Sequence, residues 1–331
     1  MLFNLHTNQK LLVSELEKRG AEIKIIDLND ELLEVNFNGR KEYLLDRFSS
    51  MAPFHMVKIS ADKHLAKKIL KSNGVQVPEG EVFTGQNVED AINYAQELFP
   101  VVLKPNWGSH GDYVEADIQN IEEIEVAIWK FVAKRGINTA FIIEKYIEGS
   151  EHRLFVTAFG GFAVVKRDPS MVIGNGTDNI LKLAETETER RKKIKAQQFS
   201  PLCPIVIDDD VNKFLYKNGI LEGLQYVPYQ DEKIYLRNQS NLAKGGLAID
   251  MTDEAHSSVK KVAFKALKSF PGLPCVGLDL ICKDISKPLS DYAIIEANSS
   301  PGLAMHMFPS AGKSRDVAAM MADVMFPHIK M

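Results

Sequence analysis

Residues 292–302 have the sequence Tyr-Ala-Ile-Ile-Glu-Ala-Asn-Ser-Ser-Pro-Gly, which places a carboxylate and an amide inside an otherwise apolar strand. Alternate side chains of a strand share one face, so Glu296 and Asn298 point the same way, with Cα atoms about 7 Å apart. Burying a carboxylate is costly unless it is paired with positive charge. The fold must therefore bring a cation to this face of the strand.

A second apolar run, residues 276–282, carries Asp279 between two leucines. The polar connection at residues 283–291 allows the two runs to pair as antiparallel neighbours, which puts Asp279 beside Glu296. The ligands on offer are all oxygens, a set that suits Mg²⁺ or Mn²⁺ rather than Zn²⁺. The alternative is that both carboxylates lie at frayed strand ends in water. The serine and glycine loop that ends at Gly302 favours a metal and anion site, because its free N–H groups can bind an anion.

The overall composition favours an ordinary cytoplasmic protein with small-molecule partners. The length of 331 residues is typical of about two domains. A net charge of −4 without a large asymmetry of sign along the chain gives no support for nucleic acid or an anionic membrane. There is no signal-peptide pattern and no run of apolar residues long enough to span a bilayer. Cys203, Cys275 and Cys282 lack metal-ligand spacing, so we expect reduced core thiols.

Hydrophobic periodicity predicts a mixed α+β chain. The expected helices are residues 8–19, 63–70, 88–98 and 121–134, and the expected strands are 22–27, 32–37, 41–45, 81–84, 101–104, 112–116, 140–144, 151–159 and 162–168. Asn38-Gly39 predicts a hairpin turn. Residues 170–179, with two glycines, are predicted as a loop. The basic run at residues 189–195 is flanked by glutamates and is typical of a solvated helix face.

Two stretches could handle a nucleotide. Lys104 ends a buried strand and is followed by Gly-Ser-His-Gly at residues 108–111, so an ammonium group and loop amides could together bind phosphate. The pattern is neither a Walker loop nor a dinucleotide fingerprint, and a structural turn is the alternative. Residues 141–149 leave a strand and lead to Glu151, which could accept hydrogen bonds from ribose hydroxyls. The alternative is a connecting strand with Glu151 in water.

Three arginines, Arg153, Arg167 and Arg237, fall near strands rather than in helices. The planar guanidinium binds two carboxylate or phosphoryl oxygens at once, which lysine cannot do. Surface ion pairs are the alternative for each. His110, His152 and His306 lack a His or Cys partner at metal spacing and are interpreted as local hydrogen-bonding residues.

Taken in order, these motifs resemble the ATP-grasp superfamily, and specifically the ATP-grasp module of cyanophycin synthetases and of bifunctional glutathione-forming enzymes. The resemblance runs from about residue 10 to the end. It rests on Asp62-Lys63, on the Lys104 strand, on residues 143–149, 167–176 and 236–246, on Gly277-Leu278-Asp279 and on residues 295–309.

The resemblance implies an ATP-grasp fold in which two α+β subdomains enclose ATP. It divides the chain into a short amino-terminal α/β piece at residues 1–58, an amino-terminal ATP-grasp subdomain at 59–140 and a carboxyl-terminal subdomain with the metal site at 141–331. The implied nucleotide-binding residues are Lys63, Lys104, His110, Gly111, Glu144, Lys145, Tyr146, Ile147 and Glu151. Two Mg²⁺ ions, with Mn²⁺ as the alternative, would be held by Asp279, Glu296 and Asn298. The implied catalytic residues are Arg237, Arg167 and Gly302, and the implied substrate-binding residues are Arg153, Asn241, Gly245 and Gly246.

The implied reaction is formation of an amide bond between an amino acid or short peptide and an amine, through an acylphosphate. A kinase that phosphorylates a small molecule, or a nucleotide-binding partner subunit without turnover, are the alternatives. The chain departs from the family pattern at Asp112 and Tyr113, where Arg and Gly are usual, and at Asn175 and Thr177, where Asp and Arg are usual. The short amino-terminal piece suggests an incomplete substrate wall, and its completion by a second subunit is the reason to expect a homo-oligomer.

Overall fold

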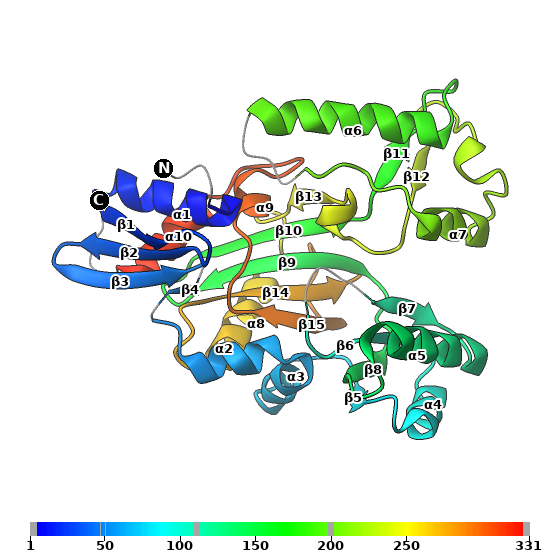
Figure 1. The fold of residues 1–331 in the computed structure, drawn as a ribbon, viewed down its shortest axis with the longest axis horizontal. Helices are drawn as coiled ribbons and strands as arrows, with labels where there is room; N and C mark the ends of the chain where they lie inside the picture. Colours follow the sequence, from blue (N-terminus) through cyan, green and yellow to red (C-terminus); the bar gives the residue numbers. More distant parts are fainter. Residues whose placement is uncertain (1–4, 47, 50, 109–112, 198–201, 327–331) are drawn as a thin grey trace.

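The computed structural model describes residues 5–46, 48–49, 51–108, 113–197 and 202–326. Their strands form four sheets beside which helices pack, and the predicted α+β class is confirmed (Figure 1). Within the described residues no helix is long and apolar enough to cross a membrane.

A five-stranded antiparallel sheet in the order β13-β10-β9-β14-β15 forms the centre of the molecule (Figure 1). Its strands are β9 (Ser150–Thr157), β10 (Phe162–Asp168), β13 (Leu247–Asp250), β14 (Cys275–Cys282) and β15 (Tyr292–Asn298). Alternation of side chains gives the sheet two different faces. Leu154 and Val156 pack on one face, whereas Phe155 packs in a separate core on the other.

The helices beside the central sheet come from distant parts of the sequence. The face with Leu154 packs against α2 (Phe54–Ala61), α3 (Lys63–Ser72) and α8 (Ser257–Lys268). The face with Phe155 packs against α1 (Thr7–Lys18), α9 (Ala304–Met307) and α10 (Val317–Met325). The amino-terminal and carboxyl-terminal ends of the chain therefore share one hydrophobic core with the central sheet.

The amino-terminal sheet consists of β1 (Glu22–Asp27), β2 (Leu32–Phe37), β3 (Arg40–Leu45) and β4 (Phe48–Ser49). Asn38 and Gly39 make the predicted hairpin turn, and both adopt positive φ angles, of 48° and 77°. The buried side chains of β2, such as Leu33 and Val35, join the core formed by α1 and α10.

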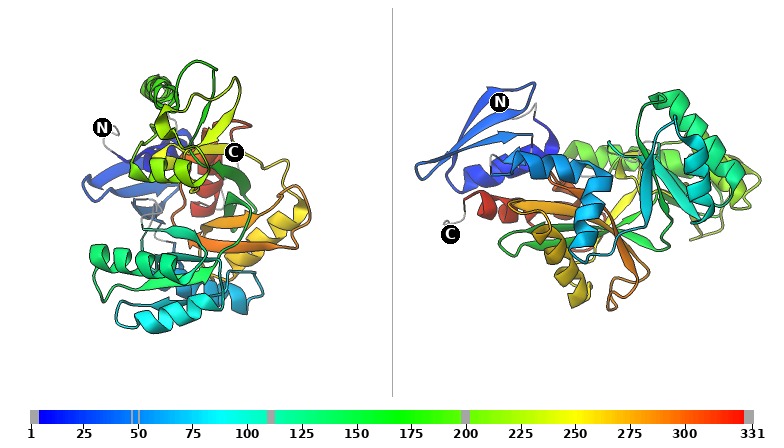
Figure 2. Two further views of the ribbon diagram at one scale, coloured as in Figure 1. Left: turned by 90° about the vertical axis from the view of Figure 1, so that its right-hand side faces the viewer. Right: turned by 90° about the horizontal axis from the view of Figure 1, so that it is seen from below.

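A further four-stranded sheet, in the order β5-β8-β6-β7, lies at the opposite end of the molecule from the amino-terminal sheet (Figure 2). Its elements are β5 (Gly80–Phe83), α4 (Val88–Gln96), β6 (Val101–Pro105), β7 (Glu115–Ile118), α5 (Ile121–Arg135) and β8 (Phe141–Lys145). The strand predicted at residues 112–116 is displaced along the sequence, because β7 begins at Glu115. Residue 112 lies outside the described part. The proposed division at 140/141 falls at the start of β8, which hydrogen-bonds to β5 and β6.

A third group of elements follows β10 and forms a lobe with its own small core. It contains β11 (Met171–Ile173), α6 (Ile180–Gln197), α7 (Asp209–Lys217), η2 (Gly223–Gln225), β12 (Lys233–Tyr235) and η3 (Leu242–Lys244). The prediction of residues 170–179 as a loop is incomplete, since β11 pairs with β12. The basic run is not wholly solvated either: Arg191 is buried and donates to the carbonyl oxygens of Cys203 and Gly245.

Candidate active site

The three proposed metal ligands meet on the central sheet through the pairing of β14 with β15. Asp279 is the register partner of Glu296, and Gly277 is the partner of Asn298. A bulge after Asp279 pairs Leu280 with Ile294, and both of these side chains are fully buried. The apolar residues therefore fix the register of the hairpin. The register in turn brings the two carboxylates side by side, as the sequence predicted.

These three side chains have a donor set that fits a hard divalent cation. Asp279 is buried, the side chain of Glu296 is 25% exposed, and the buried amide nitrogen of Asn298 has no hydrogen-bond partner among the described residues. A half-turn of this amide would place its oxygen, a metal ligand, in the same position. No group of three His, Cys, Asp or Glu side chains suited to a metal occurs in the described residues. The candidate site depends on two carboxylates and one amide.

Two arginines hold the carboxylate of Asp279. Arg153, its partner in β9, donates from Nε to Oδ1 and from Nη2 to Oδ2 at 3.1 Å, and Arg167 donates to Oδ2 at 2.9 Å. Burial alone would raise the pKa of Asp279, but the two guanidinium groups lower it to about 2. Oδ2 accepts two of these bonds and Oδ1 accepts one, so Oδ1 keeps a lone pair for a metal. Asp279 is thus ionised and ready to bind a cation.

Arg167 also links the metal ligands to Glu151. Its Nη2 forms an ion pair with Glu151, and the other carboxylate oxygen of Glu151 accepts a hydrogen bond from the hydroxyl of Ser240. The Nε of Arg167 has no hydrogen-bond partner within the described residues. Glu151 is therefore not free in water, and Arg167 keeps a donor for a further acceptor.

Lys63 lies between the metal ligands and the loop after β6. It is the first residue of α3, whose amino terminus is capped by the carboxylate of Asp62. Its Nζ donates to the carbonyl oxygen of Gly108 at 2.6 Å and lies 3.9 Å from Oε2 of Glu296. Burial lowers the pKa of this lysine. The ammonium group of Lys63 is therefore placed to bind phosphate oxygens that also bind the metal.

A buried triad of two lysines and one glutamate lies next to this site. Glu144 in β8 forms ion pairs with Lys104 through Oε1 and with Lys67 through Oε2. Burial would raise the pKa of Glu144, but the two ammonium groups lower it. The pKa of Lys67 is lowered to about 7, chiefly by burial. With Lys67 protonated, the triad carries one more positive charge than negative, so an arriving anion would be stabilised.

Sequence reasoning missed Lys67. It follows Lys63 by four residues in α3, and residues four apart lie on the same face of a helix. That spacing was the signal that could have identified it.

The proposed adenine residues lie at the end of β8. Lys145 is exposed, whereas Tyr146 and Ile147 are half-buried. The amide of Tyr146 donates to the carbonyl oxygen of Pro100 at 2.9 Å. His110 and Gly111 of the predicted phosphate loop lie outside the described residues.

The Gly302 loop is held by the amino-terminal helix α1. The Oδ1 atom of Asn8 accepts hydrogen bonds from the amides of Leu303 at 2.8 Å and Ala304 at 2.9 Å. Asn8 is itself almost fully buried. Nothing in the sequence predicted this contact, because the partners are 295 and 296 residues apart. The amino-terminal piece thus positions a loop of the candidate site.

Arg237 and the glycine pair belong to the third lobe. Arg237 donates to the hydroxyl of Ser170 at 3.2 Å and to the carbonyl oxygen of Val206 at 2.6 Å. Asn241 caps the short helix η3. Gly245 has a φ of 95°, and a Cβ added there would lie 2.8 Å from the Cα of Ile205. These contacts hold Arg237, Asn241 and Gly245 within the packing of the lobe.

Gly246 packs against β10, where an added Cβ would lie 2.9 Å from the carbonyl oxygen of Asp168. This contact connects the lobe to the strand that carries Arg167.

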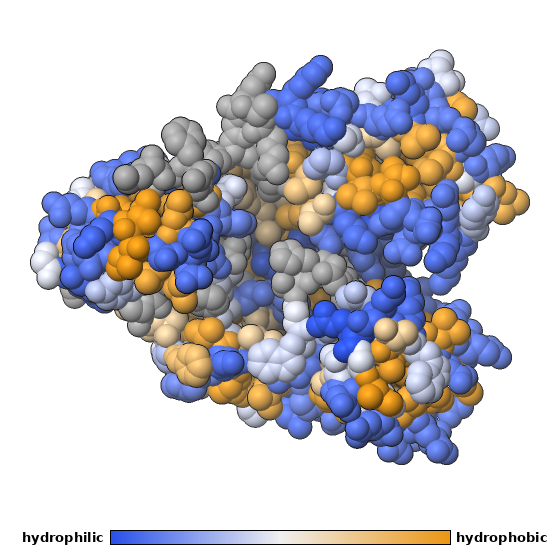
Figure 3. Space-filling model, viewed as in Figure 1, coloured by the Kyte–Doolittle hydropathy of each residue, from blue (hydrophilic) through white to orange (hydrophobic). Residues whose placement is uncertain are grey.

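Figure 3 shows a hollow between the lobe with α6 and α7 and the lobe with α4 and α5. The central sheet lies between these two lobes and the amino-terminal sheet (Figure 1).

Comparison with known proteins relates the whole chain to larger biosynthetic enzymes. It is 33% identical over 329 residues to a cyanophycin synthetase of Trichormus variabilis, covering 98% of this chain and 35% of that protein. It is 30% identical over 337 residues to a glutathione biosynthesis bifunctional protein of Pasteurella multocida, covering 99% of this chain and 43% of that protein. No family model matches the sequence.

A solved structure gives the same relationship. The crystal structure of a bifunctional glutathione synthetase from Pasteurella multocida matches with a TM-score of 0.70 and 28% identity, over 98% of this chain and 45% of that one. The fold is therefore that of an ATP-grasp protein. Within that superfamily the chain is a relative of the cyanophycin synthetases and the bifunctional glutathione-forming enzymes, and it spans less than half the length of those it matches.

Proposed function

We propose that this chain is an ATP-dependent carboxylate–amine ligase that joins an amino acid or short peptide to an amine. The observation that carries the proposal is the pairing of Asp279 with Glu296, with Asn298 beyond them and Lys63 within 3.9 Å of Glu296. Hard oxygen ligands next to buried ammonium groups are what a metal–triphosphate complex requires. The relatives, a cyanophycin synthetase and a glutathione biosynthesis bifunctional protein, support an amide product.

We assign ATP to the hollow between the lobe with α6 and α7 and the lobe with α4 and α5. Lys63 and Lys104 would bind phosphates, with His110 and Gly111 of the loop after β6. Residues 144–147 would surround adenine and Glu151 would bind ribose. Asp279, Glu296 and Asn298 would hold Mg²⁺, as two ions by the family pattern, with Mn²⁺ as a substitute. Bound metal supplies charge neutralisation for the transferring phosphoryl group.

The reaction begins when a carboxylate oxygen of the acid substrate attacks the γ-phosphorus and ADP leaves. The amine nitrogen then attacks the acyl carbon, phosphate leaves, and the nitrogen loses a proton to give the amide. Arg167 has an unpartnered Nε that could bind the acylphosphate, and Arg237 and the amide of Gly302 are the further candidates for stabilising charge. Arg153, Asn241, Gly245 and Gly246 remain proposed substrate-binding residues.

The domain divisions, the oligomeric state, the excluded partners and the cellular setting belong with this proposal. The divisions at residues 58/59 and 140/141 stay predictions, as do a homo-oligomer and the absence of nucleic-acid and membrane partners. Cys203, Cys275 and Cys282 are free thiols, which supports a reducing, cytoplasmic setting.

The test is to supply amino acids singly and in pairs with Mg-ATP and to follow ADP, phosphate and product mass. Phosphate release that requires both an acid and an amine, with an amide product, supports the ligase. A stable phosphorylated product would identify a kinase instead. Protein with Glu296→Gln is the control for contaminating ATPase activity.

A further inference from the structure

Residues 238–240 connect two lobes of the molecule. They belong to the lobe with α6 and α7 and lie between β12 and η3. Gln239 donates from Nε2 to the carbonyl oxygen of Val114, just before β7, at 2.6 Å, and the hydroxyl of Ser240 donates to Oε2 of Glu151 in β9. Two neighbouring residues therefore contact the lobe with α4 and α5 and the central sheet at once.

A second contact between the same two lobes lies beside the first. Lys130 on α5 forms an ion pair with Glu115, the residue after Val114. The pKa of Lys130 is raised, chiefly by its hydrogen bond to Glu115 and, against the effect of burial, also by the charge of Asp210 on α7. The two lobes thus meet at the start of β7, and Gln239 is part of that contact.

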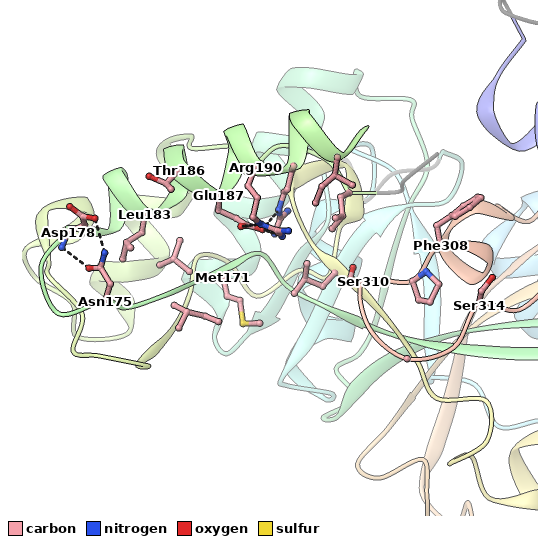
Figure 4. Close-up of a pocket in the computed structure, with 18 of the residues that line it drawn as sticks. Met171, Asn175, Asp178, Leu183, Thr186, Glu187, Arg190, Phe308, Ser310 and Ser314 are labelled. Carbon is pink, nitrogen blue, oxygen red and sulfur yellow. Dashed lines mark hydrogen bonds and ion pairs between the residues drawn. The ribbon is translucent and has the colours of Figure 1, made fainter. Parts of the chain in front are cut away.

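The lobe with α6 and α7 holds residues 238–240 in place. Arg237, directly before them, donates to the hydroxyl of Ser170 at 3.2 Å. Ser170 precedes β11, which forms one side of a cavity of about 730 Å³ beside α6. Figure 4 shows Met171 of β11 across this cavity from Arg190 of α6. Residues 238–240 are therefore fixed to the same unit as β11 and α6.

Ser240 and Arg167 together orient the carboxylate of Glu151. Arg167 pairs with Oε1 and Ser240 with Oε2, and each oxygen keeps a lone pair for one further donor. Glu151 lies on the same face of β9 as Arg153, and its side chain is 22% exposed, so a ligand can reach it. A ribose has two neighbouring hydroxyls, which can donate to two carboxylate oxygens at once. Without the hydroxyl of Ser240, only Oε1 would be fixed.

We propose that Ser240 is a positioning residue for the ribose of the nucleotide. Its hydroxyl fixes Oε2 of Glu151, so that both carboxylate oxygens accept from the 2′- and 3′-hydroxyls, and Gln239 holds Ser240 in place from the other lobe. The inference rests on the proposed function and deepens it, because it gives the lobe with α6 and α7 a part in selecting ribonucleotides over deoxynucleotides.

The test is calorimetric titration of the full chain with Mg-ADP and with Mg-2′,3′-dideoxy-ADP, which lacks both ribose hydroxyls. We expect the unchanged protein to bind ADP about tenfold or more tightly than the dideoxy nucleotide, since hydrogen bonds to a charged acceptor are lost. In Ser240→Ala this ratio should fall by about threefold or more, while the affinity for dideoxy-ADP stays the same. Ser240→Thr retains a hydroxyl and should recover the ratio.

Further variants separate positioning from a general effect on folding. In protein that already carries Glu151→Gln, Ser240→Ala should not change the ratio further, because the two side chains act through one contact. Gln239→Ala should lower the ratio as well, because it releases the segment from the other lobe. The matched control is Thr186→Ala, which removes a hydroxyl of the same lobe that bonds to Lys182 of its own helix, and it should leave the ratio unchanged.

Three results would overturn the inference: equal loss of affinity for both nucleotides in Ser240→Ala, tighter binding of ADP by that variant, or a ratio near one in the unchanged protein. Equal loss would make Ser240 a structural residue, and tighter binding would make it a competitor of the ribose for Glu151. Failure of the unchanged protein to bind ADP would overturn the nucleotide site and the ligase proposal with it. If the ratios respond as expected but no acid and amine pair yields ADP, the ligase proposal fails while the role of Ser240 stands.

Discussion

Asp279 lies directly opposite Arg153 in the pairing of β14 with β9, and the guanidinium donates to both oxygens of the carboxylate. This pair has a consequence for the metal site. A carboxylate with a pKa near 2 is ionised across the physiological range, so a cation need not displace a proton to bind it. The second ligand, Glu296, is more exposed, and its Oε2 lies 3.9 Å from Nζ of Lys63.

Glu296→Gln should therefore abolish turnover with little effect on folding. Loss of the carboxylate removes a metal ligand, and we expect ADP release to fall by roughly a hundredfold or more. The melting temperature should stay within a few degrees, because the side chain is partly exposed and has one long contact. ADP release and thermal unfolding measure the two effects. Glu185→Gln on the surface of α6 is the control, and equal activity in both variants would remove the proposed metal site.

The Lys67–Glu144–Lys104 triad should respond unequally to loss of its members. Glu144→Gln leaves two buried ammonium groups without a counter-charge and should destabilise the chain by about 3–5 kcal/mol. Lys67→Met leaves Glu144 paired with Lys104 and should lower the free energy of unfolding far less. Because Lys67 supplies the excess positive charge, its loss should weaken ATP binding. Denaturant unfolding and nucleotide titration measure these effects, and equal destabilisation by both variants would argue against this account of the triad.

Asn8→Ala should slow catalysis, although Asn8 is not one of the charged residues around Asp279. It removes the acceptor for the amides of Leu303 and Ala304, which would cost about 1–3 kcal/mol if they stay buried. If Gly302 contributes a donor to the reaction, kcat should fall more than the KM for ATP rises. Asn8→Asp retains an acceptor and should recover part of kcat. A stability loss without any change in kcat would show that Asn8 is structural only.

His306 and His152 should make the chain less stable in mild acid. Burial lowers the pKa of His306 to about 3 and that of His152 to about 4. Both values lie below the unfolded value of about 6.5. The unfolded chain therefore binds more protons between about pH 6.5 and 4, and the free energy of unfolding decreases as pH falls through that window.

His306→Leu should reduce this dependence by about 1.4 kcal/mol per pH unit. Denaturant unfolding between pH 7 and 5 measures the slope. His55→Gln, at an exposed position, is the control. An unchanged slope in His306→Leu would mean that His306 is not buried in its neutral form.

The parts of the site that the sequence predicted depend on short-range patterns. The β14–β15 hairpin follows from two apolar runs with a polar connection, and it alone brings Asp279 to Glu296. The helix with Lys63 follows from its Asp62 cap and hydrophobic spacing. Local signals of this kind need no knowledge of the rest of the fold.

The parts that the sequence did not predict depend on distant partners. The strand β11 has only three residues and exists by pairing with a segment about sixty residues away. Asn8 acts on a loop at the other end of the chain. The interpretation of His306 as a hydrogen-bonding residue is wrong, since neither ring nitrogen has a partner among the described residues and the ring packs on Phe155. His152 does have a neighbour, the thiol of Cys282 at 3.9 Å.

The most direct test of the central claim follows oxygen from the acid substrate to phosphate. With an acid substrate in which both carboxyl oxygens are ¹⁸O, the acylphosphate route transfers one labelled oxygen to inorganic phosphate for each amide formed. Mass spectrometry of the released phosphate should show one ¹⁸O per molecule in the protein with Asp279, Glu296 and Asn298 intact. Unlabelled phosphate released together with an amide product would contradict the proposed mechanism.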